Sequence, residues 1–318
     1  MYGNFQTTSQ SIRLDFFIIM DLELLKAEYL NYSKHFKSPG TYRYDASHLK
    51  IIIEFLTSSG YNDTDELDFD SIYSFIDYSR NLENSNKTIN KRISLLNRAI
   101  AFEVQQQKCS PSIIAAFPKL KEIDKRFDII DQQTMTRIIN YLLDQTNTFM
   151  NIRNRALVFL FIDTGARLSE VTNIKSANIN ISEKYVLLDH TKTKKERVVY
   201  FSDITAKYMF EYISLVDDSS VYLFRNSISN LPINYLGVIR VFQKIRDALG
   251  LAKLSSHMIR HSYGTLAYQK QVPSLFTKNT MGHARIEMTE RYTHYDIKTN
   301  SEIYKNFSPM KHYLDNKK

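Results

Sequence analysis

The feature that most constrains the fold is an apolar helical segment that ends at a glycine. Residues 154–162 are mostly apolar around the whole circumference of a helix, which predicts a buried helix. Gly165 is expected to end this helix, because glycine readily adopts the left-handed conformation at a helix C-terminus. Arg167 then lies in a turn, and Ser169 is expected to cap the helix that follows. The stretch 164–170 therefore predicts an arginine held at the edge of an apolar core.

The chain is long enough for two hydrophobic cores and carries a basic net charge. Its 318 residues favour two domains on length alone. Lysine and arginine number 42 against 34 aspartate and glutamate, a formal charge of +8 that favours a polyanionic partner such as nucleic acid. The single cysteine, Cys109, excludes an intramolecular disulfide and favours a reducing, cytoplasmic location. The apolar stretch 16–20 is shorter than the roughly 20 residues of a membrane span, so no membrane association is expected.

Residues 21–108 predict a small domain made only of helices. Apolar side chains recur there at intervals of three or four residues, in segments separated by breaks rich in serine, glycine or asparagine. Thr41 is expected to cap the second helix and Asp70 the third. The last helix carries basic residues that are candidates for DNA contact, namely Lys87, Lys91 and Arg92. From this helix alone, an ordinary solvated face explains these charges equally well.

A proline-containing segment separates this domain from a second one. Two prolines interrupt the helical pattern and lysines accumulate beside the second proline, so residues 109–130 are expected to form a linker. Residues 131–304 return to helical patterns, except for β-branched or aromatic runs at 185–188 and 197–201. These two runs flank a turn rich in threonine and lysine that contains Lys192, which predicts a β-hairpin.

Polar residues of the second domain are of the types that phosphodiester chemistry needs. Breaking a DNA strand while conserving the energy of its bond needs a protein nucleophile, cations at the phosphate oxygens and an acid for the departing 5′ oxygen. Arg167 and Arg260 suit the cationic role, because a planar guanidinium stays charged and binds oxygens bidentately. His257 stands three residues before Arg260, so a helix would place both on one side. Each residue taken alone also has an ordinary structural explanation. Arg167 and Glu170, for example, would form a helix-surface ion pair.

The order of these residues resembles that of the tyrosine recombinases of the phage integrase type. The resemblance extends from about Asp21 to Tyr304. It rests on several motifs together: Thr164-Gly165-Ala166-Arg167-Leu168-Ser169-Glu170, Lys192 in the hairpin ending Lys195-Glu196-Arg197, His257-x-x-Arg260-His261, and Gly282-His283 followed nine residues later by Tyr292. No single one of these motifs would suffice to indicate the resemblance. Met281 and the Thr191-Lys192-Thr193 tip depart from the leucine and the Gly-Lys-Gly that the family commonly has.

The resemblance implies roles for the residues that would contact the phosphate. Tyr292 would be the nucleophile that forms a 3′-phosphotyrosyl bond. Arg167 and Arg260 would stabilise the pentacoordinate phosphate. His257 would assist proton transfer at the tyrosine, and His283 would hydrogen-bond the phosphate.

The resemblance also implies an acid and a supporting residue. Lys192 would protonate the 5′ oxygen, with Lys194 and Lys195 as alternatives because the choice depends on the alignment of the hairpin. Glu170 would orient the active-site residues from behind. No cofactor and no metal ion are expected, because the arginines and the lysine supply the positive charge that a metal supplies in other enzymes.

The implied architecture is mainly α-helical with a small β-sheet in the catalytic domain. A helical core-binding domain (21–108) would be joined by the linker to a mixed α/β catalytic domain (131–304). Residues 1–20 are expected to be a disordered extension, with an upstream start codon before Met20 as the alternative that the sequence leaves open. Residues 305–318 would form a tail that docks on a neighbouring protomer. The expected partners are double-stranded DNA with a specific core site and further copies of the chain, assembled as a tetramer on two duplexes. A need for accessory proteins stays open.

Two other functions share parts of this pattern. A DNA-binding accessory protein of the same ancestry would not cleave DNA, but here every expected catalytic position is filled. A type IB topoisomerase shares the phosphotyrosine chemistry but more often has lysine at the position of His257. The leading hypothesis is a site-specific recombinase that acts in dimer resolution or in the integration and excision of a mobile element. The sequence leaves the target site and the choice between these roles open.

Overall fold

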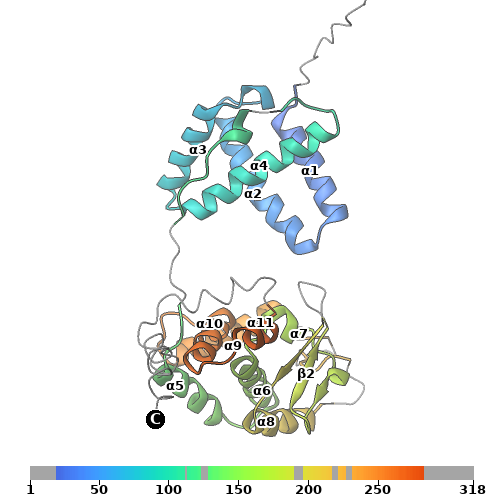
Figure 1. Ribbon diagram of the computed structural model, residues 1–318, viewed down its shortest axis with the longest axis vertical. Helices are drawn as coiled ribbons and strands as arrows, with labels where there is room; N and C mark the ends of the chain where they lie inside the picture. Colours follow the sequence, from blue (N-terminus) through green and yellow to red (C-terminus); the bar gives the residue numbers. More distant parts are fainter. Residues whose placement is uncertain are drawn as a thin grey trace, which may run out of the picture. The chain divides into compact units, whose positions relative to one another are not determined.

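The chain folds into two units, residues 1–125 and 126–318 (Figure 1). The computed structural model describes residues 19–111, 113–122, 128–189, 196–216, 221–226 and 231–282. The first unit is helical, and the second packs helices around a small antiparallel sheet, which confirms the predicted fold class. None of the described helices is long and apolar enough to cross a membrane.

In the residues that the structure describes, the first unit has four α-helices and two short 3₁₀ turns. Its core is formed by the apolar faces of the helices and includes fully buried side chains such as Leu25, Ile52 and Phe75. α1 contacts both α2 and α4, and α3 contacts α2 and α4. The elements are α1 (Leu22–Phe36), α2 (Pro39–Ser58), η1 (Thr64–Glu66), α3 (Phe69–Asn81), α4 (Asn86–Gln105) and η2 (Ile113–Ala116).

Two helices of this unit begin earlier than the sequence predicts. Ser38, and not Thr41, caps α2, and its Oγ accepts from the backbone N–H of the residue three positions on at 3.2 Å. Pro39 occupies the first turn, where its missing N–H leaves no hydrogen bond unmade, so the proline starts the helix. Asp68, and not Asp70, caps α3 in the same way, at 2.8 Å. Both predicted caps lie inside the first turn of their helices.

Much of the expected linker is part of the first unit. Residues 109–111 and 113–122 pack on α4, and Cys109 and Ile114 are buried in the core of this unit. The buried side chain of Asn90 donates to the carbonyl oxygen of Leu120 and accepts from its backbone N–H, both at 2.9 Å. The prolines in this segment prevent a long helix but not close packing. The division between the two units falls after this segment, between residues 125 and 126.

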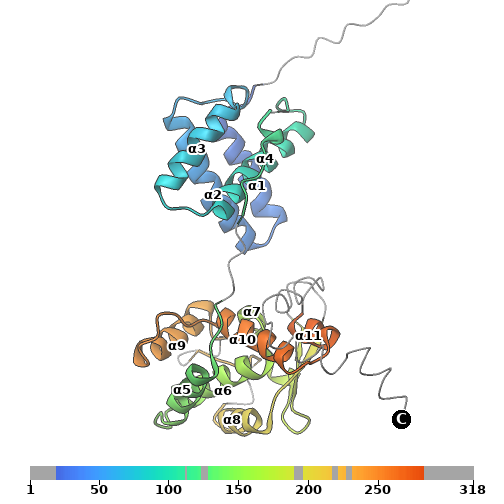
Figure 2. The same ribbon diagram turned by 60° about the vertical axis from the view of Figure 1, so that its left-hand side comes forward.

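The second unit combines helices with a three-stranded sheet of order β1-β2-β3, which lies at one edge of the unit (Figures 1 and 2). β2 and β3 pair antiparallel with Val186 opposite Val199, which confirms the predicted hairpin. The strands are β1 (Ile179–Asn180), β2 (Tyr185–Leu188) and β3 (Arg197–Tyr200). The helices are α5 (Gln132–Leu143), α6 (Phe149–Thr164), α7 (Leu168–Thr172), α8 (Asp203–Ile213), α9 (Tyr235–Ala248), α10 (Ser256–Gln269) and α11 (Ser274–Met281), with a 3₁₀ turn, η3 (Ser176–Asn178).

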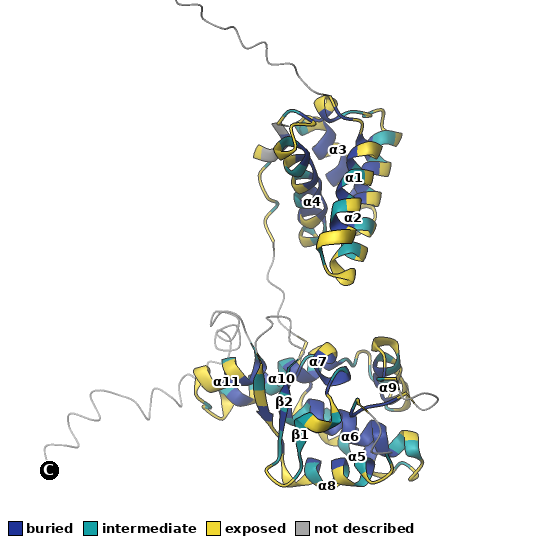
Figure 3. Ribbon diagram, turned by 90° about the vertical axis from the view of Figure 1, so that its right-hand side faces the viewer, coloured by how far each residue is buried: buried dark blue, intermediate teal, exposed yellow. Residues whose placement is uncertain are grey.

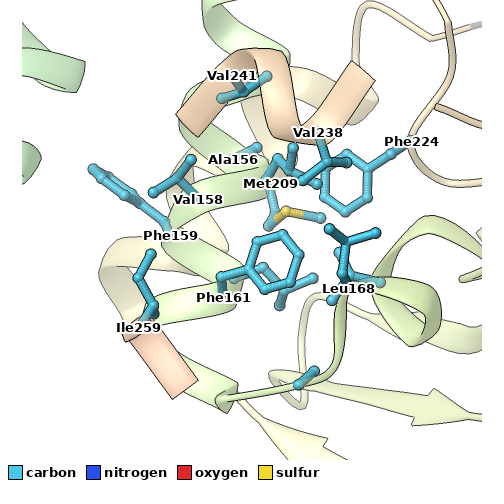
Figure 4. Packing of buried hydrophobic residues seen from close by; sticks show 14 of the residues in the cluster. Ala156, Val158, Phe159, Phe161, Leu168, Met209, Phe224, Val238, Val241 and Ile259 are labelled. Atoms are coloured by element: carbon cyan, nitrogen blue, oxygen red, sulfur yellow. The ribbon is translucent and has the colours of Figure 1, made fainter. Parts of the chain in front are cut away.

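Helix α6 is the central element of the second unit. It contacts α5, α8, α10 and β3, and it is buried along most of its length (Figure 3). Phe161 of α6 packs in a cluster with Met209, Phe224 and Leu168 from other parts of the unit (Figure 4). The predicted buried helix is therefore confirmed, with more residues at both ends than the apolar run indicates. Because α6 is held on all sides, the turn at its C-terminus is held as well.

We predict that Asn90→Ala loosens the segment after α4. The change leaves the N–H and carbonyl of Leu120 without their side-chain partner, and a buried group without its hydrogen bond costs about 1–3 kcal/mol. Amide exchange at Leu120 in the full chain should show this loss of protection. Asn86→Ala is the matched control. It removes a side-chain hydrogen bond from the same helix to the Lys121 carbonyl, but that bond is exposed to solvent. Equal protection in the two variants would contradict the prediction.

Candidate active site

The site begins at the turn that ends α6. Gly165 closes the helix in the left-handed conformation, with φ of +57°. A Cβ at this position would lie 2.8 Å from the ring of Tyr263 on α10, so only glycine fits both the backbone conformation and the space. α10 therefore packs directly against the turn. The predicted role of Gly165 as the end of the helix is confirmed.

Arg167 immediately precedes the short helix α7 and is tied to Glu170 one turn later. The Glu170 carboxylate accepts from the Arg167 backbone N–H at 2.7 Å and from its Nη1 at 3.0 Å. Glu170 thus caps the helix from inside its first turn. Ser169 is exposed and lies within α7, so the predicted cap at Ser169 is wrong. The Arg167 side chain is 19% exposed, which places it at the edge of the core.

Glu170 is a buried carboxylate shared by two arginines. Arg197, the first residue of β3, donates from Nη1 and Nη2 to its two oxygens at 2.7 and 2.6 Å. Burial alone disfavours the charged carboxylate, but the hydrogen bonds and charge of Arg197, with a further contribution from Arg167, keep the pKa of Glu170 below its ordinary value. Glu170 is therefore ionised at neutral pH. The pair of Arg167 and Glu170 is part of a buried network rather than a helix-surface ion pair.

Arg260, the second arginine of the predicted site, contacts the turn after α6 and the last residue of α11. Arg260 is buried on α10 and donates from Nη1 to the Gly165 carbonyl at 2.7 Å and from Nη2 to the Met281 carbonyl at 2.6 Å. Arg167 donates from Nη2 to the next carbonyl along, that of Gly282, at 2.7 Å. Both guanidiniums are thus held between the turn after α6 and the C-terminus of α11.

His257 lies one turn before Arg260 on α10 and belongs to the same site. Burial of part of its ring lowers the pKa of His257, and the charges of Arg260 and Arg167 lower it further. The imidazole is therefore neutral at pH 7 and able to accept a proton. The structure thus brings together three of the predicted catalytic residues, and Glu170 behind them.

The other predicted catalytic residues, Lys192, His283 and Tyr292, lie outside the described residues. In the sequence, Lys192 lies in the connection between β2 and β3, and His283 directly follows Gly282, the residue after α11. Among the residues that the structure describes, no three His, Cys, Asp or Glu side chains are grouped so as to hold a metal ion.

The candidate DNA contacts in the first unit differ in their exposure. Lys87 and Lys91 are exposed on α4, whereas Arg92 is only 7% exposed. Nε and Nη1 of Arg92 are buried and have no hydrogen-bond partner among the residues that the structure describes, and burial lowers the pKa of this guanidinium. Arg92 is therefore part of the packing between helices, unlike the two lysines.

Sequence reasoning missed Arg197 and Tyr263 as parts of the site. The alternating pattern of the strand that contains Arg197 predicts which face of the sheet each side chain lies on, but not what it contacts. The partners of Arg197 are 27 and 83 positions away in the chain. Tyr263 is one of 21 tyrosines and stands three residues after Arg260. That spacing was a usable signal, because it places Tyr263 on the same side of α10.

Comparison with known proteins agrees with this geometry. The model of the phage integrase family matches residues 129–298, which include the whole described site. The chain belongs to the phage integrase family, the tyrosine recombinases.

Relatives and solved structures extend the likeness over most of the chain. It is 24% identical over 290 residues to a probable integrase/recombinase of Acholeplasma phage L2, covering 91% of this chain and 98% of that protein. It is 27% identical over 239 residues to the tyrosine recombinase XerC of Lactobacillus delbrueckii subsp. bulgaricus, covering 71% and 78%. The fold is similar to that of the Tn1549 transposon integrase in complex with transposon right end DNA (TM-score 0.73, 13% identity, 91% and 100% covered). It is also similar to that of XerH bound to palindromic difH substrate (TM-score 0.72, 17% identity, 91% and 85% covered).

We predict that His257 titrates below the ordinary histidine range and that Arg167→Met raises its pKa. Removing a nearby cation makes the imidazolium less unfavourable, so the midpoint should move toward higher pH. A histidine-resolved NMR titration measures both effects. His48 serves as the internal control, because its lowered pKa has other causes, namely burial and the charges of Arg92 and Lys91. A midpoint of His257 that does not respond to Arg167→Met would contradict the prediction.

Proposed function

We propose that this protein is a site-specific DNA recombinase that cuts and rejoins DNA through a 3′-phosphotyrosyl intermediate. The observation that carries the proposal is the convergence of Arg167 and Arg260 on the turn after α6 and on the end of α11, with His257 close enough to both arginines for their charges to lower its pKa. The arrangement supplies cations for a phosphate and a neutral base beside them. Tyr292 follows α11 in the sequence and would provide the nucleophile.

The proposed cleavage step balances without an outside reactant. The Tyr292 hydroxyl oxygen attacks the scissile phosphorus and gives its proton toward His257, which is neutral and can accept it. The bond from phosphorus to O5′ breaks, and O5′ leaves with a proton from Lys192. The strand is then held as a 3′-phosphotyrosine, and attack by a 5′ hydroxyl reverses every transfer. His283 would add a hydrogen bond to the phosphate.

Arginine geometry supports binding of the phosphate between Arg167 and Arg260. A guanidinium binds oxyanions through a planar set of N–H groups, and its charge does not depend on pH. Among the described residues, Arg167 uses one N–H of each terminal nitrogen for protein contacts. Its further N–H groups have no partner among those residues, and we propose that they bind the phosphate. Bonds to the protein fix the guanidinium before the substrate arrives, so little reorganisation accompanies the reaction.

The DNA and the assembly are proposed by analogy with the relatives. The similar integrase and XerH structures are described as bound to transposon-end DNA and to difH substrate. We propose that this chain likewise binds a double-stranded core site, with Lys87 and Lys91 contacting phosphates. A tetramer on two duplexes would exchange the strands, with residues 305–318 docking on a neighbouring protomer. The relatives include a phage integrase and XerC, so both element movement and dimer resolution are consistent with this chemistry.

Covalent trapping tests the proposal directly. The full chain is incubated with nicked suicide duplexes, taken from DNA that flanks its gene and from the host dimer-resolution site. We expect a protease-sensitive covalent adduct with at least one duplex. Tyr292→Phe should form none because it lacks the attacking oxygen. Arg167→Ala should lose cleavage, by about 100-fold or more, while retaining most DNA binding in a mobility-shift assay.

Three outcomes would count against the proposal. An adduct that persists in Tyr292→Phe would show that another residue is the nucleophile. Binding without cleavage on every duplex would indicate the silent accessory protein. Relaxation of any supercoiled plasmid without sequence preference would indicate a topoisomerase.

A further inference from the structure

Arg197 lies where three separate parts of the site meet, and the proposed chemistry gives it no role. It is the first residue of β3, directly after the connection that contains Lys192. Its Nη1 and Nη2 bind the two oxygens of Glu170, and its Nε donates to the Thr280 carbonyl in α11 at 2.9 Å. One side chain thus links the base of the hairpin to the start of α7 and to the last turn of α11.

The fit around Arg197 is too close for another side chain to replace it. A Cβ at Gly282 would lie 2.8 Å from Cζ and Nη1 of Arg197, so the guanidinium rests directly on the glycine that ends α11. Lysine has a single nitrogen and cannot reach both carboxylate oxygens and the Thr280 carbonyl in this fixed planar geometry. The Arg197 side chain is only 10% exposed, and its carboxylate partner is fully buried.

Arg197 and Arg167 also act on the same carboxylate. Arg167 binds Oε1 of Glu170 at 3.0 Å, and Arg197 binds Oε1 at 2.7 Å and Oε2 at 2.6 Å. A displacement of β3 relative to α7 would therefore break the bonds of Arg197, whereas Arg167 keeps its own bonds to Glu170 through its backbone N–H and Nη1. The start of the hairpin strand and the phosphate-binding arginine are held in one frame.

We propose that Arg197 is a positioning residue that fixes the hairpin strand β3 against Glu170 and α11, and so sets where the lysine of the β2–β3 connection can deliver its proton. The inference rests on the proposed recombinase function. Arg197 touches neither the scissile phosphate nor the tyrosine in this role. Its loss should slow the departure of O5′ more than it weakens DNA binding or attack by the tyrosine.

A change of leaving group separates this role from a general one. In a duplex whose scissile bond carries sulfur in place of O5′, the departing thiolate is stable enough to leave without a proton. A variant that has only lost its acid should cleave this duplex normally. A variant that has lost its phosphate-binding frame should cleave both duplexes poorly.

The experiment measures single-turnover cleavage on a duplex that the unsubstituted chain converts to the covalent adduct. We expect Arg197→Gln to cleave the oxygen duplex about 10- to 100-fold more slowly, since a displacement of about 1 Å costs up to 100-fold. The sulfur duplex should be cleaved at close to the rate of the unsubstituted chain. On the oxygen duplex, the rate of Arg197→Lys should fall between that of Arg197→Gln and that of the unsubstituted chain. Lys184→Gln is the matched control, because it removes an exposed cation of an ion pair just before the same hairpin.

The outcomes distinguish the inference from the function on which it rests. Equal losses on the oxygen and sulfur duplexes, or no loss on either, overturn the positioning role and leave the recombinase proposal intact. Loss of folding in both Arg197→Gln and Arg197→Lys, judged by thermal unfolding, also overturns it, because Arg197 would then be only structural. If the unsubstituted chain forms no adduct on any duplex, the proposed function itself fails.

Discussion

The buried charge of Glu170 is the constraint on which the site depends. An isolated carboxylate in a protein interior costs several kcal/mol, and only close partners of opposite charge offset that cost. Glu170 has them in Arg197 and Arg167, together with the backbone N–H of Arg167. Because these partners belong to different segments, satisfying one carboxylate requires α7 and β3 to lie in one arrangement. The position of Arg167, the proposed phosphate-binding residue, follows from the need to neutralise a buried acid.

The packing of α6 makes this arrangement reproducible. Its apolar surface is covered on all sides, so its C-terminal turn at Gly165 has a fixed place. The carbonyl of Gly165 then accepts from Arg260, and the ring of Tyr263 closes over the glycine. Two residues of α10 therefore contact the end of α6 directly. An apolar core with no chemistry of its own thus determines where the charged groups meet.

The sequence predicted local structure and residue types well, and long-range partners poorly. Periodicity located the buried helix and the hairpin, because each depends on neighbours within a few positions. The caps at Thr41 and Asp70 were wrong because Ser38 and Asp68 are equally suitable residues, and only backbone geometry selects among them. The cap at Ser169 was wrong because α7 begins directly after Arg167, whose backbone N–H is bound by Glu170. The resemblance to tyrosine recombinases named Arg167, Arg260 and His257, which do converge. Arg197 was missed because its contacts to Glu170 and Thr280 depend on tertiary structure alone.

The balance of charge in the described part of the site suits the proposed reaction. Arg167, Arg197 and Arg260 carry three positive charges against the single negative charge of Glu170, and His257 is neutral at pH 7. A phosphodiester carries one negative charge, and a second develops as the oxygen of the attacking tyrosine gives up its proton. The excess positive charge therefore matches the pentacoordinate state more closely than the substrate. Preorganised charge that fits the transition state better than the ground state lowers the barrier. Glu170 contributes by holding the arginines in place while leaving their net charge positive.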